Sequence, residues 1–262
     1  MVRKLIATQF FKFMDRGRSA PALCGCADLQ EAPAGQYVVK LCGAVDAREA
    51  ALINELLASL LASHFGLVVA SPATIALDRS FVELVALRHP ARTDALKRSV
   101  GLNFGTRHLV GVSTWPVNKA IPGELASTAF EVFAFDALVQ NPDRTFGNPN
   151  LFIGREGFTI FDHDAAFSFC FAVGPKVDPW SVDRLPFLEQ HAFFTRLKSK
   201  PIEIEGFISA LVGLSDAVLE SMVAEVPPEW ENQKYMEKII QHLRSVRDHA
   251  EEFSASIGRV LR

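Results

Sequence analysis

The stretch of chain that decides the fold lies between residues 141 and 164. It opens with Asn141-Pro142-Asp143-Arg144-Thr145-Phe146-Gly147-Asn148-Pro149-Asn150-Leu151 and closes with Phe161-Asp162-His163-Asp164. The segment between them has apolar runs at 151–153 and 158–161 on either side of a glycine-containing turn, which predicts a β-hairpin. Ahead of the loop, an apolar pattern with helical period at 124–140 predicts a helix. The polar residues therefore lie in a loop between a helix and a hairpin.

The residue types in this stretch suit phosphoryl transfer to a hydroxyl. Such a reaction needs an aspartate to orient the acceptor and oxygen ligands that hold magnesium on a triphosphate. Asp143 and Asn148 have the D-x-x-x-x-N spacing of a kinase catalytic loop. Asp162 follows the hairpin, where a second magnesium-binding carboxylate is expected. Each match is weak alone, because Asp and Asn are common in loops, but their order is informative.

Two charged residues upstream extend this pattern. Lys40 ends the β-branched run at 36–41, and apolar segments at 5–13 and 22–26 complete three predicted strands of an antiparallel meander. A helix is predicted at 47–65, with Asp46 and Glu49 as a capping box and Gly66 as the stop. Glu55 lies on a row of small residues of this helix.

Taken alone, Lys40 is typical of a lysine snorkelling at a sheet edge and Glu55 of a solvated helix residue. Together they favour the lysine–glutamate ion pair of a kinase. The segment Gly17-Arg18-Ser19 lies between the first two predicted strands. It suits a loop folded over phosphates and suits an ordinary hairpin turn equally well.

The remaining sequence predicts an α+β, bilobal fold. Strands are expected at 67–77 and 102–112, with one or two short helices between them at 81–99. Further helices are expected at 186–198, 204–212 and 216–224, and one last helix after Pro227-Pro228. We place the lobe boundary at Trp115-Pro116. This gives an N-lobe at 1–115, with a small antiparallel sheet and one main helix, and a mostly helical C-lobe at 116–262.

Composition narrows the class of protein. The chain has 262 residues, 49% hydrophobic, and a net charge of −3, which excludes a disordered chain. The pI near 6.2 argues against general nucleic-acid binding. The 21 Phe residues against 2 Tyr predict buried ring packing, including Phe146 and Phe171. The four cysteines have no metal-site spacing, and we expect reduced thiols. Residues 1–18 do not resemble a signal peptide and 50–70 is a poor membrane span, so we expect a cytoplasmic protein without membrane contact.

These motifs together resemble the HipA-like kinases, in the compact form of the domain rather than the longer HipA toxin. The Asp-Arg-x-x-x-Asn arrangement is also similar to that of phosphoinositide kinases. The resemblance covers residues 17–167 and rests on Gly17-Arg18-Ser19-Ala20-Pro21, Val38-Val39-Lys40, Asn54-Glu55, Asn103-Phe104-Gly105-Thr106, Asn141-x-Asp143-Arg144-x-x-x-Asn148-Pro149-Asn150 and Phe161-Asp162-His163.

The resemblance implies a bilobal protein-kinase-like fold, ATP with Mg²⁺, and phosphorylation of a serine or threonine in a protein substrate that the sequence does not identify. Asp143 would be the catalytic aspartate, and Asn148 and Asp162 would hold magnesium. Lys40 would contact phosphates while pairing with Glu55.

Three further roles follow from the same resemblance. Gly17 and Ser19 would belong to the loop that covers the nucleotide, with Ser19 as a candidate for autophosphorylation. Residues 110–115 would form the hinge that faces adenine. Any regulatory partner stays unknown.

The sequence also departs from its relatives. Thr145 stands where HipA toxins commonly have His, and Asp162-His163-Asp164 lacks the glycine of Asp-Phe-Gly. Asp164 is either a further metal ligand or a solvated turn residue, and His163 is more typical of a structural residue than of a general base. Two alternatives therefore stay open: a kinase for a small molecule or lipid headgroup, and a nucleotide-binding module without turnover.

Overall fold

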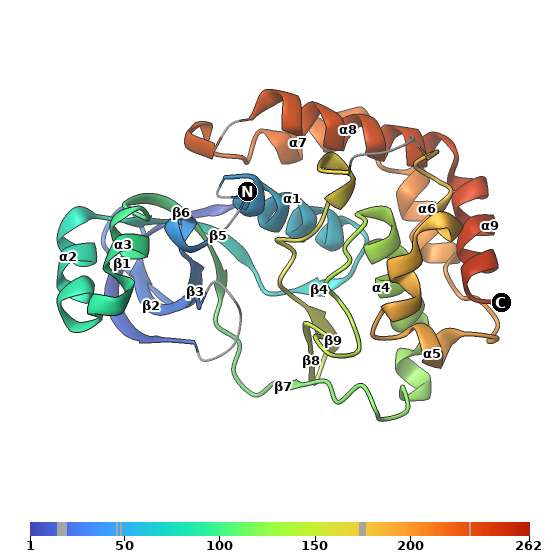
Figure 1. The fold of residues 1–262 in the computed structure, drawn as a ribbon, viewed down its shortest axis with the longest axis horizontal. Coiled ribbons are helices and arrows are strands. Elements are labelled where there is room, and N and C mark those ends of the chain that lie inside the picture. Colours follow the sequence, from blue (N-terminus) through green and yellow to red (C-terminus); the bar gives the residue numbers. More distant parts are fainter. Residues whose placement is uncertain (15–19, 46, 48, 173–176, 231) are drawn as a thin grey trace. The chain divides into compact units, whose positions relative to one another are not determined.

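The computed structural model describes residues 1–14, 20–45, 47, 49–172, 177–230 and 232–262. The chain forms two compact units (Figure 1). The first comprises Met1–Ser59, Ala70–Val110 and Glu225–Glu231, and the second comprises Leu60–Val69, Gly111–Ala224 and Asn232–Arg262. The expected division into an N-lobe at 1–115 and a C-lobe at 116–262 places one boundary in the chain, and it stays a prediction.

The first unit is built on a closed five-stranded barrel. Its strands are β1 (Arg3–Phe13), β2 (Ala22–Ala27), β3 (Pro33–Lys40), β5 (Pro72–Leu77) and β6 (Gly101–Arg107). Their order around the barrel is β1-β2-β3-β6-β5. The antiparallel meander predicted for the first three strands is confirmed. In the closed order each of the five strands pairs with a neighbouring strand on both sides over at least part of its length.

The expectation of a purely antiparallel sheet is wrong, because β1 and β5 pair in parallel. A parallel pair needs a long crossover connection, and the helix between β3 and β5 supplies it. The barrel interior contains Leu5, Cys24, Val39 and Ile75, all at most 2% exposed. Gly105 of β6 faces this interior, where a Cβ would lie 2.3 Å from Cδ1 of Ile75.

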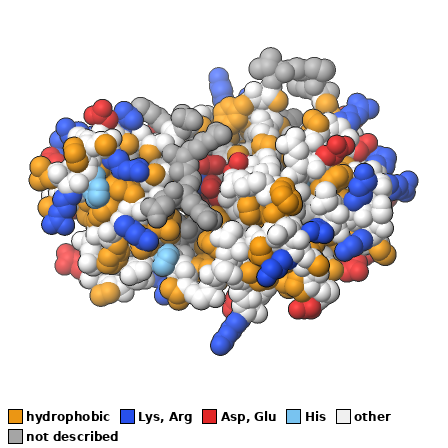
Figure 2. Space-filling model, turned by 60° about the horizontal axis from the view of Figure 1, so that its bottom comes forward, with side chains coloured by type: hydrophobic (Ala, Val, Ile, Leu, Met, Phe, Trp, Pro, Cys, Tyr) orange, Lys and Arg blue, Asp and Glu red, His pale blue; other side chains and the backbone are white. Residues whose placement is uncertain are grey.

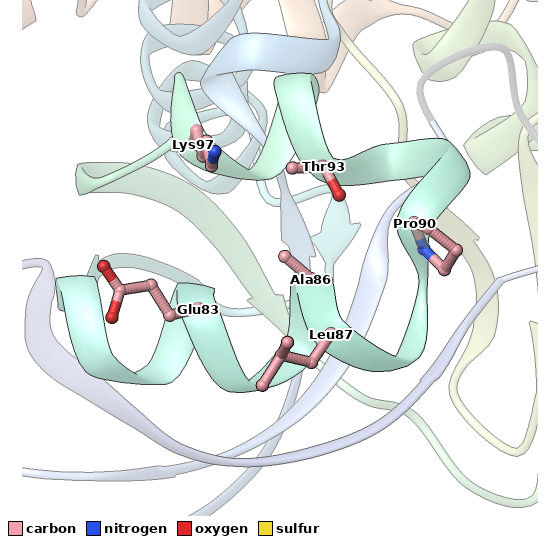
Figure 3. Close-up of a pocket in the computed structure, with 6 residues that line it drawn as sticks. All are labelled: Glu83, Ala86, Leu87, Pro90, Thr93 and Lys97. Carbon is pink, nitrogen blue, oxygen red and sulfur yellow. The ribbon is translucent and has the colours of Figure 1, made fainter.

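The helices α2 (Arg79–Arg88) and α3 (Thr93–Lys97) confirm the prediction of short helices at 81–99. They place Val82, Val85 and Leu96 in the same apolar core as the barrel residues. Together with the 3₁₀ turn between them, these helices line a surface groove formed by Glu83, Ala86, Leu87, Pro90, Thr93 and Lys97 (Figure 3). None of the expected site residues lines this groove.

The helix α1 (Glu49–His64) follows the first three barrel strands and precedes β5 and β6. The expected capping residue Asp46 lies outside the described residues, whereas the predicted stop is confirmed. Gly66 adopts φ +75°, and the N–H of Leu67 reaches back to the Ala62 carbonyl at 2.9 Å, as in a Schellman motif. The nine residues from Ala51 to Ser59, including polar Asn54 and Glu55, are all buried.

The second unit contains the sheet β4 (Val68–Val69), β9 (Gly157–Ile160), β8 (Leu151–Gly154) and β7 (Ser113–Thr114), in that order. The strands β8 and β9 form the predicted antiparallel hairpin. The helix α4 (Ala126–Leu138) precedes it and is buried all round from Ala129 onward except at Glu131. The predicted helices at 204–212 and 216–224 are confirmed as α6 (Glu205–Val212) and α7 (Asp216–Val223).

The predicted helix at 186–198 is wrong. A 3₁₀ turn at Pro186–Gln190 and the short α5 (Phe194–Leu197) replace it, and His191 between them has an extended backbone with ψ 142°. His191 is drawn out of helical geometry because it forms an isolated β-bridge with Thr145. The local apolar pattern contains no sign of this long-range contact.

The last helix is also divided. After a 3₁₀ turn at Pro228–Trp230, α8 (Gln233–Asp248) and α9 (Ala250–Val260) meet at His249, whose φ of −125° and ψ of 40° break the helix. The ring of His249 stacks on Trp180 with centroids 3.5 Å apart. This stacking holds the chain at the break.

The phenylalanine excess serves ring packing, as predicted. Phe130, Phe133 and Phe135 of α4 are at most 2% exposed. The expectation fails for Phe146 and Phe171, which are 57% and 58% exposed. All four cysteines are free thiols, and burial raises the pKa of Cys24 and Cys26 to about 12.

The surface carries charges of both signs. Figure 2 shows Lys and Arg side chains interspersed with Asp and Glu on one face of the molecule. Within the described residues, no single helix has the length and apolarity needed to span a bilayer. The pair α6 and α7 passes that test only together, and it is bent by 83°.

Candidate active site

The loop that carries Asp143 begins at the end of α4, where Gln140 adopts a left-handed φ of 46°. The N–H of Asn141 then bonds to the carbonyl of Asp136 at 2.9 Å, and Asn141 Oδ1 accepts the N–H of Asp143 at 3.1 Å. Further along, Thr145 and Asn148 exchange main-chain bonds of 3.0 and 3.2 Å. The loop is therefore a closed turn with its own hydrogen bonds.

The carboxylate of Asp143 is held by two amide side chains. Its Oδ2 accepts from Nδ2 of Asn148 at 2.7 Å and from Nδ2 of Asn150 at 3.0 Å. Asp143 is half-buried, Asn148 is exposed and Asn150 is buried. Two donors on one oxygen restrict the rotation of the carboxylate, so that its direction is set before any acceptor binds.

Asp162 lies two residues beyond β9 and adopts a left-handed φ of 61°. Asn150, immediately before β8, adopts φ 45°. The two residues flank the open end of the hairpin, and there the N–H of Phe161 donates to the Asn150 carbonyl at 3.2 Å. Asn and Asp tolerate this conformation better than other residues with side chains, and such positions gather at functional sites.

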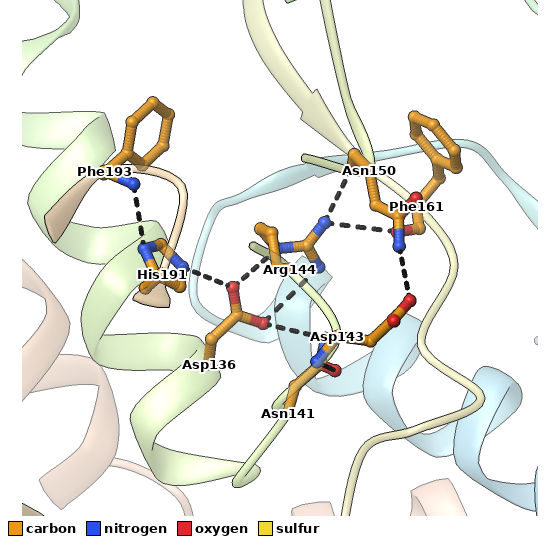
Figure 4. Close-up of polar contacts among 8 residues, drawn as sticks. All are labelled: Asp136, Asn141, Asp143, Arg144, Asn150, Phe161, His191 and Phe193. Atoms are coloured by element: carbon orange, nitrogen blue, oxygen red, sulfur yellow. Dashed lines mark hydrogen bonds and ion pairs between the residues drawn. The ribbon is translucent and has the colours of Figure 1, made fainter. Parts of the chain in front are cut away.

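Arg144 joins the loop to the hairpin (Figure 4). It is 1% exposed, and its Nη1 donates to the carbonyl of Asn150 at 2.6 Å and to that of Phe161 at 3.2 Å. Its Nε forms an ion pair with Oδ2 of Asp136 at 2.5 Å. One guanidinium thus contacts α4 and both chain segments at the open end of the hairpin.

Asp136 is completely buried in α4. Burial raises the pKa of its carboxyl, but the charge of Arg144 and the hydrogen bonds from His191 and Arg144 outweigh this and hold the pKa at about 2. Asn141 Nδ2 adds a bond of 3.2 Å to Oδ1. The carboxylate is therefore ionised throughout the neutral pH range.

His191 approaches the same carboxylate, with Nε2 at 3.0 Å from Oδ2 of Asp136. Burial lowers the pKa of His191, partly opposed by Asp136, so the ring is neutral at pH 7. Its Nδ1 accepts the N–H of Phe193 at 3.1 Å (Figure 4). Because Nδ1 is an acceptor, the ring proton resides on Nε2 and is donated to Asp136.

In the first unit, Lys40 at the end of β3 forms an ion pair with Glu55 of α1. The side chains are 12% and 2% exposed. The chain after Lys40 is fixed by Asn103, whose Oδ1 accepts the N–H of Cys42 at 2.8 Å and whose Nδ2 donates to the Ser99 carbonyl at 2.8 Å. The expected pairing is present, and its role toward a nucleotide stays a prediction.

Comparison with known proteins decides the family. A model of the HipA-like kinase family matches residues 7–255, nearly the whole chain. The chain belongs to the HipA-like kinase family. No curated protein matches it.

A solved kinase structure agrees with a kinase-like fold. The proinflammatory kinase CtkA of Helicobacter pylori is similar with a TM-score of 0.54 and 10% identity, over 98% of each chain. The MAP kinase LmaMPK10 of Leishmania major matches with a TM-score of 0.32 and 12% identity, over 98% of this chain and 82% of that chain. At this identity the first similarity shows the fold alone. This HipA-like kinase is a phosphotransferase by family.

Some expected site residues of this HipA-like kinase are not placed. Gly17 and Ser19 lie outside the described residues. In the expected hinge at 110–115, Ser113 and Thr114 form β7, and Trp115 is buried with its ring 5.0 Å from Phe158. Contact of this segment with adenine stays a prediction.

His163 and Asp164 follow Asp162. His163 is 1% exposed, its ring meets Phe135 edge-on at 6.1 Å, and its carbonyl accepts the N–H of Ala166 at 2.9 Å. These contacts support the structural interpretation of His163. Asp164 is half-buried, and both interpretations of it stay open.

Sequence reasoning missed three residues that support Asp143: Asp136, Asn150 and His191. Asp136 had a usable signal, because a lone carboxylate inside an otherwise apolar helix must find a partner when buried. Asn150 belonged to the quoted motif without a role. For His191 the sequence contains no such signal, since this residue reaches the loop from a segment more than forty residues later in the chain.

Proposed function

We propose that this HipA-like kinase transfers the γ-phosphoryl group of ATP to a serine or threonine hydroxyl of a protein. The observation that carries the proposal is the carboxylate of Asp143, held by Asn148 and Asn150 on a closed loop beside the hairpin that ends at Asp162. In phosphoryl transfer most of the catalysis is positioning and charge stabilisation, and this arrangement provides the first.

Asp143 would orient the acceptor hydroxyl and receive its proton. The acceptor oxygen forms a bond to the γ-phosphorus while the bond from that phosphorus to the β–γ bridging oxygen breaks, and ADP leaves. The fixed direction of the carboxylate removes a rotation that would otherwise have to be lost in the transition state.

The donor set on the second unit fits Mg²⁺. Asn148 donates through Nδ2, so its amide oxygen is the side-chain atom that can bind a cation, and Asp162 offers a carboxylate. Mg²⁺ prefers such oxygen ligands together with phosphate oxygens. When bound, it would offset the negative charge of the phosphates. Asn148 and Asp162 would hold it, and Asp164 is a further oxygen donor next to Asp162.

On the first unit, Lys40 would bind phosphate oxygens. Its ion pair with the almost fully buried Glu55 restricts the ammonium to one region. A buried, ionised glutamate without such a partner would destabilise the fold, so Lys40 and Glu55 are expected to stay paired in the folded chain. The same pair supports a kinase for a small-molecule acceptor equally, so the acceptor must be tested directly.

The test is transfer of label from γ-labelled ATP with magnesium, using the whole chain, a cell extract and the small-molecule fraction of that extract. We expect label on protein serine or threonine with the wild-type chain and none with Asp143→Ala or Asp162→Ala of unchanged melting temperature. Transfer by Asp143→Ala at the wild-type rate would refute the assignment. Label confined to small molecules would favour the alternative acceptor, and ATP binding without any ADP formation would favour a module without turnover.

A further inference from the structure

We propose that Asp136, Arg144 and His191, called here the anchoring network, are positioning residues that hold Asp143 and Asp162 at a set separation. None of the three is assigned a role by the kinase motif itself. The proposal rests on the proposed function for its catalytic consequence, whereas the placement of the loop is a separate and measurable property.

Arg144 provides the connection. Its Nη1 contacts the carbonyls of Asn150 and Phe161, which flank the open end of the β8–β9 hairpin, one before β8 and one after β9. The side chain of Asn150 binds the carboxylate of Asp143, and Phe161 immediately precedes Asp162. One rigid planar group is therefore linked on one side to the catalytic aspartate and on the other to the proposed metal ligand. A lysine, with a single ammonium, cannot bridge carbonyls and carboxylate in the same way.

Asp136 fixes the position of this guanidinium. It belongs to a helix that is buried almost all round, so its backbone cannot shift without disturbing the core. Nε and Nη2 of Arg144 approach its two oxygens at 2.5 and 3.4 Å, which is a fork-like contact. Because Arg144 is as buried as Asp136, the pair also removes the cost of an isolated buried charge.

His191 closes the network from the opposite side. Its neutral ring donates to Asp136 without adding charge, so the Asp136–Arg144 pair stays balanced. The main chain around it adds bonds from the Ala192 N–H to the Arg144 carbonyl at 3.0 Å and from the Phe146 N–H to the Gln190 carbonyl at 3.2 Å. The segment bends out of helical geometry at this point, as the isolated bridge with Thr145 shows.

A network that only stabilises the fold and a network that positions the loop differ in which amides of a variant lose protection from hydrogen exchange. If the network only stabilises the fold, conservative variants should loosen the whole second unit evenly. If it positions the loop, they should loosen residues 143–162 while the distant helices stay protected. Three loop amides report this directly, those of Thr145, Asn148 and Phe161, because each donates to a main-chain carbonyl within this region.

The experiment compares the full chain with Arg144→Lys, His191→Gln and His191→Leu. The matched controls are Arg259→Lys, which alters an exposed pair with Asp183, and His242→Gln, which alters another buried histidine bonded to the Leu138 carbonyl. We expect the three loop amides to exchange about tenfold faster in Arg144→Lys and His191→Leu, as for a lost charge-assisted bond. Amides of α8 should keep their wild-type rates, and both controls should leave the loop unchanged.

Turnover gives the second readout. For Arg144→Lys we expect kcat to fall about 100-fold, as for an ångström-scale misplacement, with the KM for ATP within about threefold of wild type. His191→Gln retains an N–H toward Asp136 and should lose less kcat than His191→Leu.

Unchanged loop exchange in both Arg144→Lys and His191→Leu would overturn the proposal, and so would equal acceleration across α8. A wild-type chain without turnover would instead refute the proposed kinase function. The exchange rates would still decide whether the network holds the loop.

Discussion

Replacing Asp136 by asparagine isolates the charge of the buried pair. The side chain keeps its size and one oxygen, but Arg144, 1% exposed, loses its counter-charge. The neutral His191 cannot supply a negative charge in its place. Removing one partner of a buried ion pair costs about 3–5 kcal/mol. Since Arg144 keeps its bonds to two carbonyls, we expect the lower end, about 3 kcal/mol.

In a chain of this size, 1 kcal/mol corresponds to about 2–4 °C in melting temperature, so Asp136→Asn should melt about 6–12 °C lower. Differential scanning calorimetry at pH 7 measures this. The control is Asp183→Asn, which disrupts a partly exposed pair with Arg259 and should lower the melting temperature by less than Asp136→Asn does.

A double variant sharpens the prediction. Replacing Asp136 by Leu and Arg144 by Met removes both buried charges, and such replacements are often neutral or stabilising. We expect the melting temperature to recover only in part, because His191 loses its acceptor and the Asn150 and Phe161 carbonyls lose the donor that Arg144 provides. Turnover should stay low, because no group then reaches these two carbonyls. An Asp136→Asn protein that melts within about 2 °C of wild type would refute the reasoning, since a buried arginine without a counter-charge should destabilise the fold by more than that.

Three other predictions concern separate parts of the chain. Glu55→Gln should lower kcat/KM for ATP by about 10–100-fold and also lower the melting temperature, because the mostly buried Lys40 loses its counter-charge. Steady-state kinetics with Glu49→Gln as control will show the first effect, and unchanged kinetics would contradict the prediction. Burial lowers the pKa of His242 to about 4, so its contribution to stability is complete above about pH 6.5 and is lost as the pH falls toward 4; urea unfolding of His242→Gln should show a flatter pH dependence than wild type in that window. Gly105→Ala places a Cβ against Ile75 and should cost about 1–3 kcal/mol, and Ile75→Val in the same chain should recover part of it; an additive further loss would show that the clash is not the cause.

Much of the candidate site could be predicted because its parts are close in sequence. Asp143, Asn148 and Asn150 lie within one loop, so their spacing already restricts how their side chains meet. The hairpin after the loop follows from two short apolar runs around a turn, and it places Asp162 at a strand end. The Lys40–Glu55 pair was predictable because a strand that ends in lysine and a helix with one carboxylate on a small-residue row are both local patterns.

The two wrong predictions about the fold, the helix at 186–198 and the purely antiparallel sheet, have a common physical cause. The apolar period at 186–198 is compatible with a helix, yet His191 leaves helical geometry because bonds to Thr145 and Asp136 are worth more than one more helical turn. The parallel pairing of β1 with β5 depends on where the chain returns after α1, which no property of either strand specifies. In both cases a long-range contact overrides the local preference.

By itself, the sequence determined the chemistry of this HipA-like kinase: which carboxylates and amides are offered, in what order, and on which kind of element. Only the tertiary structure decided which of them are held in place. Asp136, Arg144 and His191 come together from a helix, a loop and a distant bend. The strength of their interactions depends on burial, because an ion pair that contributes little in water becomes costly to break where water is excluded. Burial belongs to the folded chain as a whole, so a local pattern could suggest that Asp136 needs a partner but could not show that the partners are Arg144 and His191.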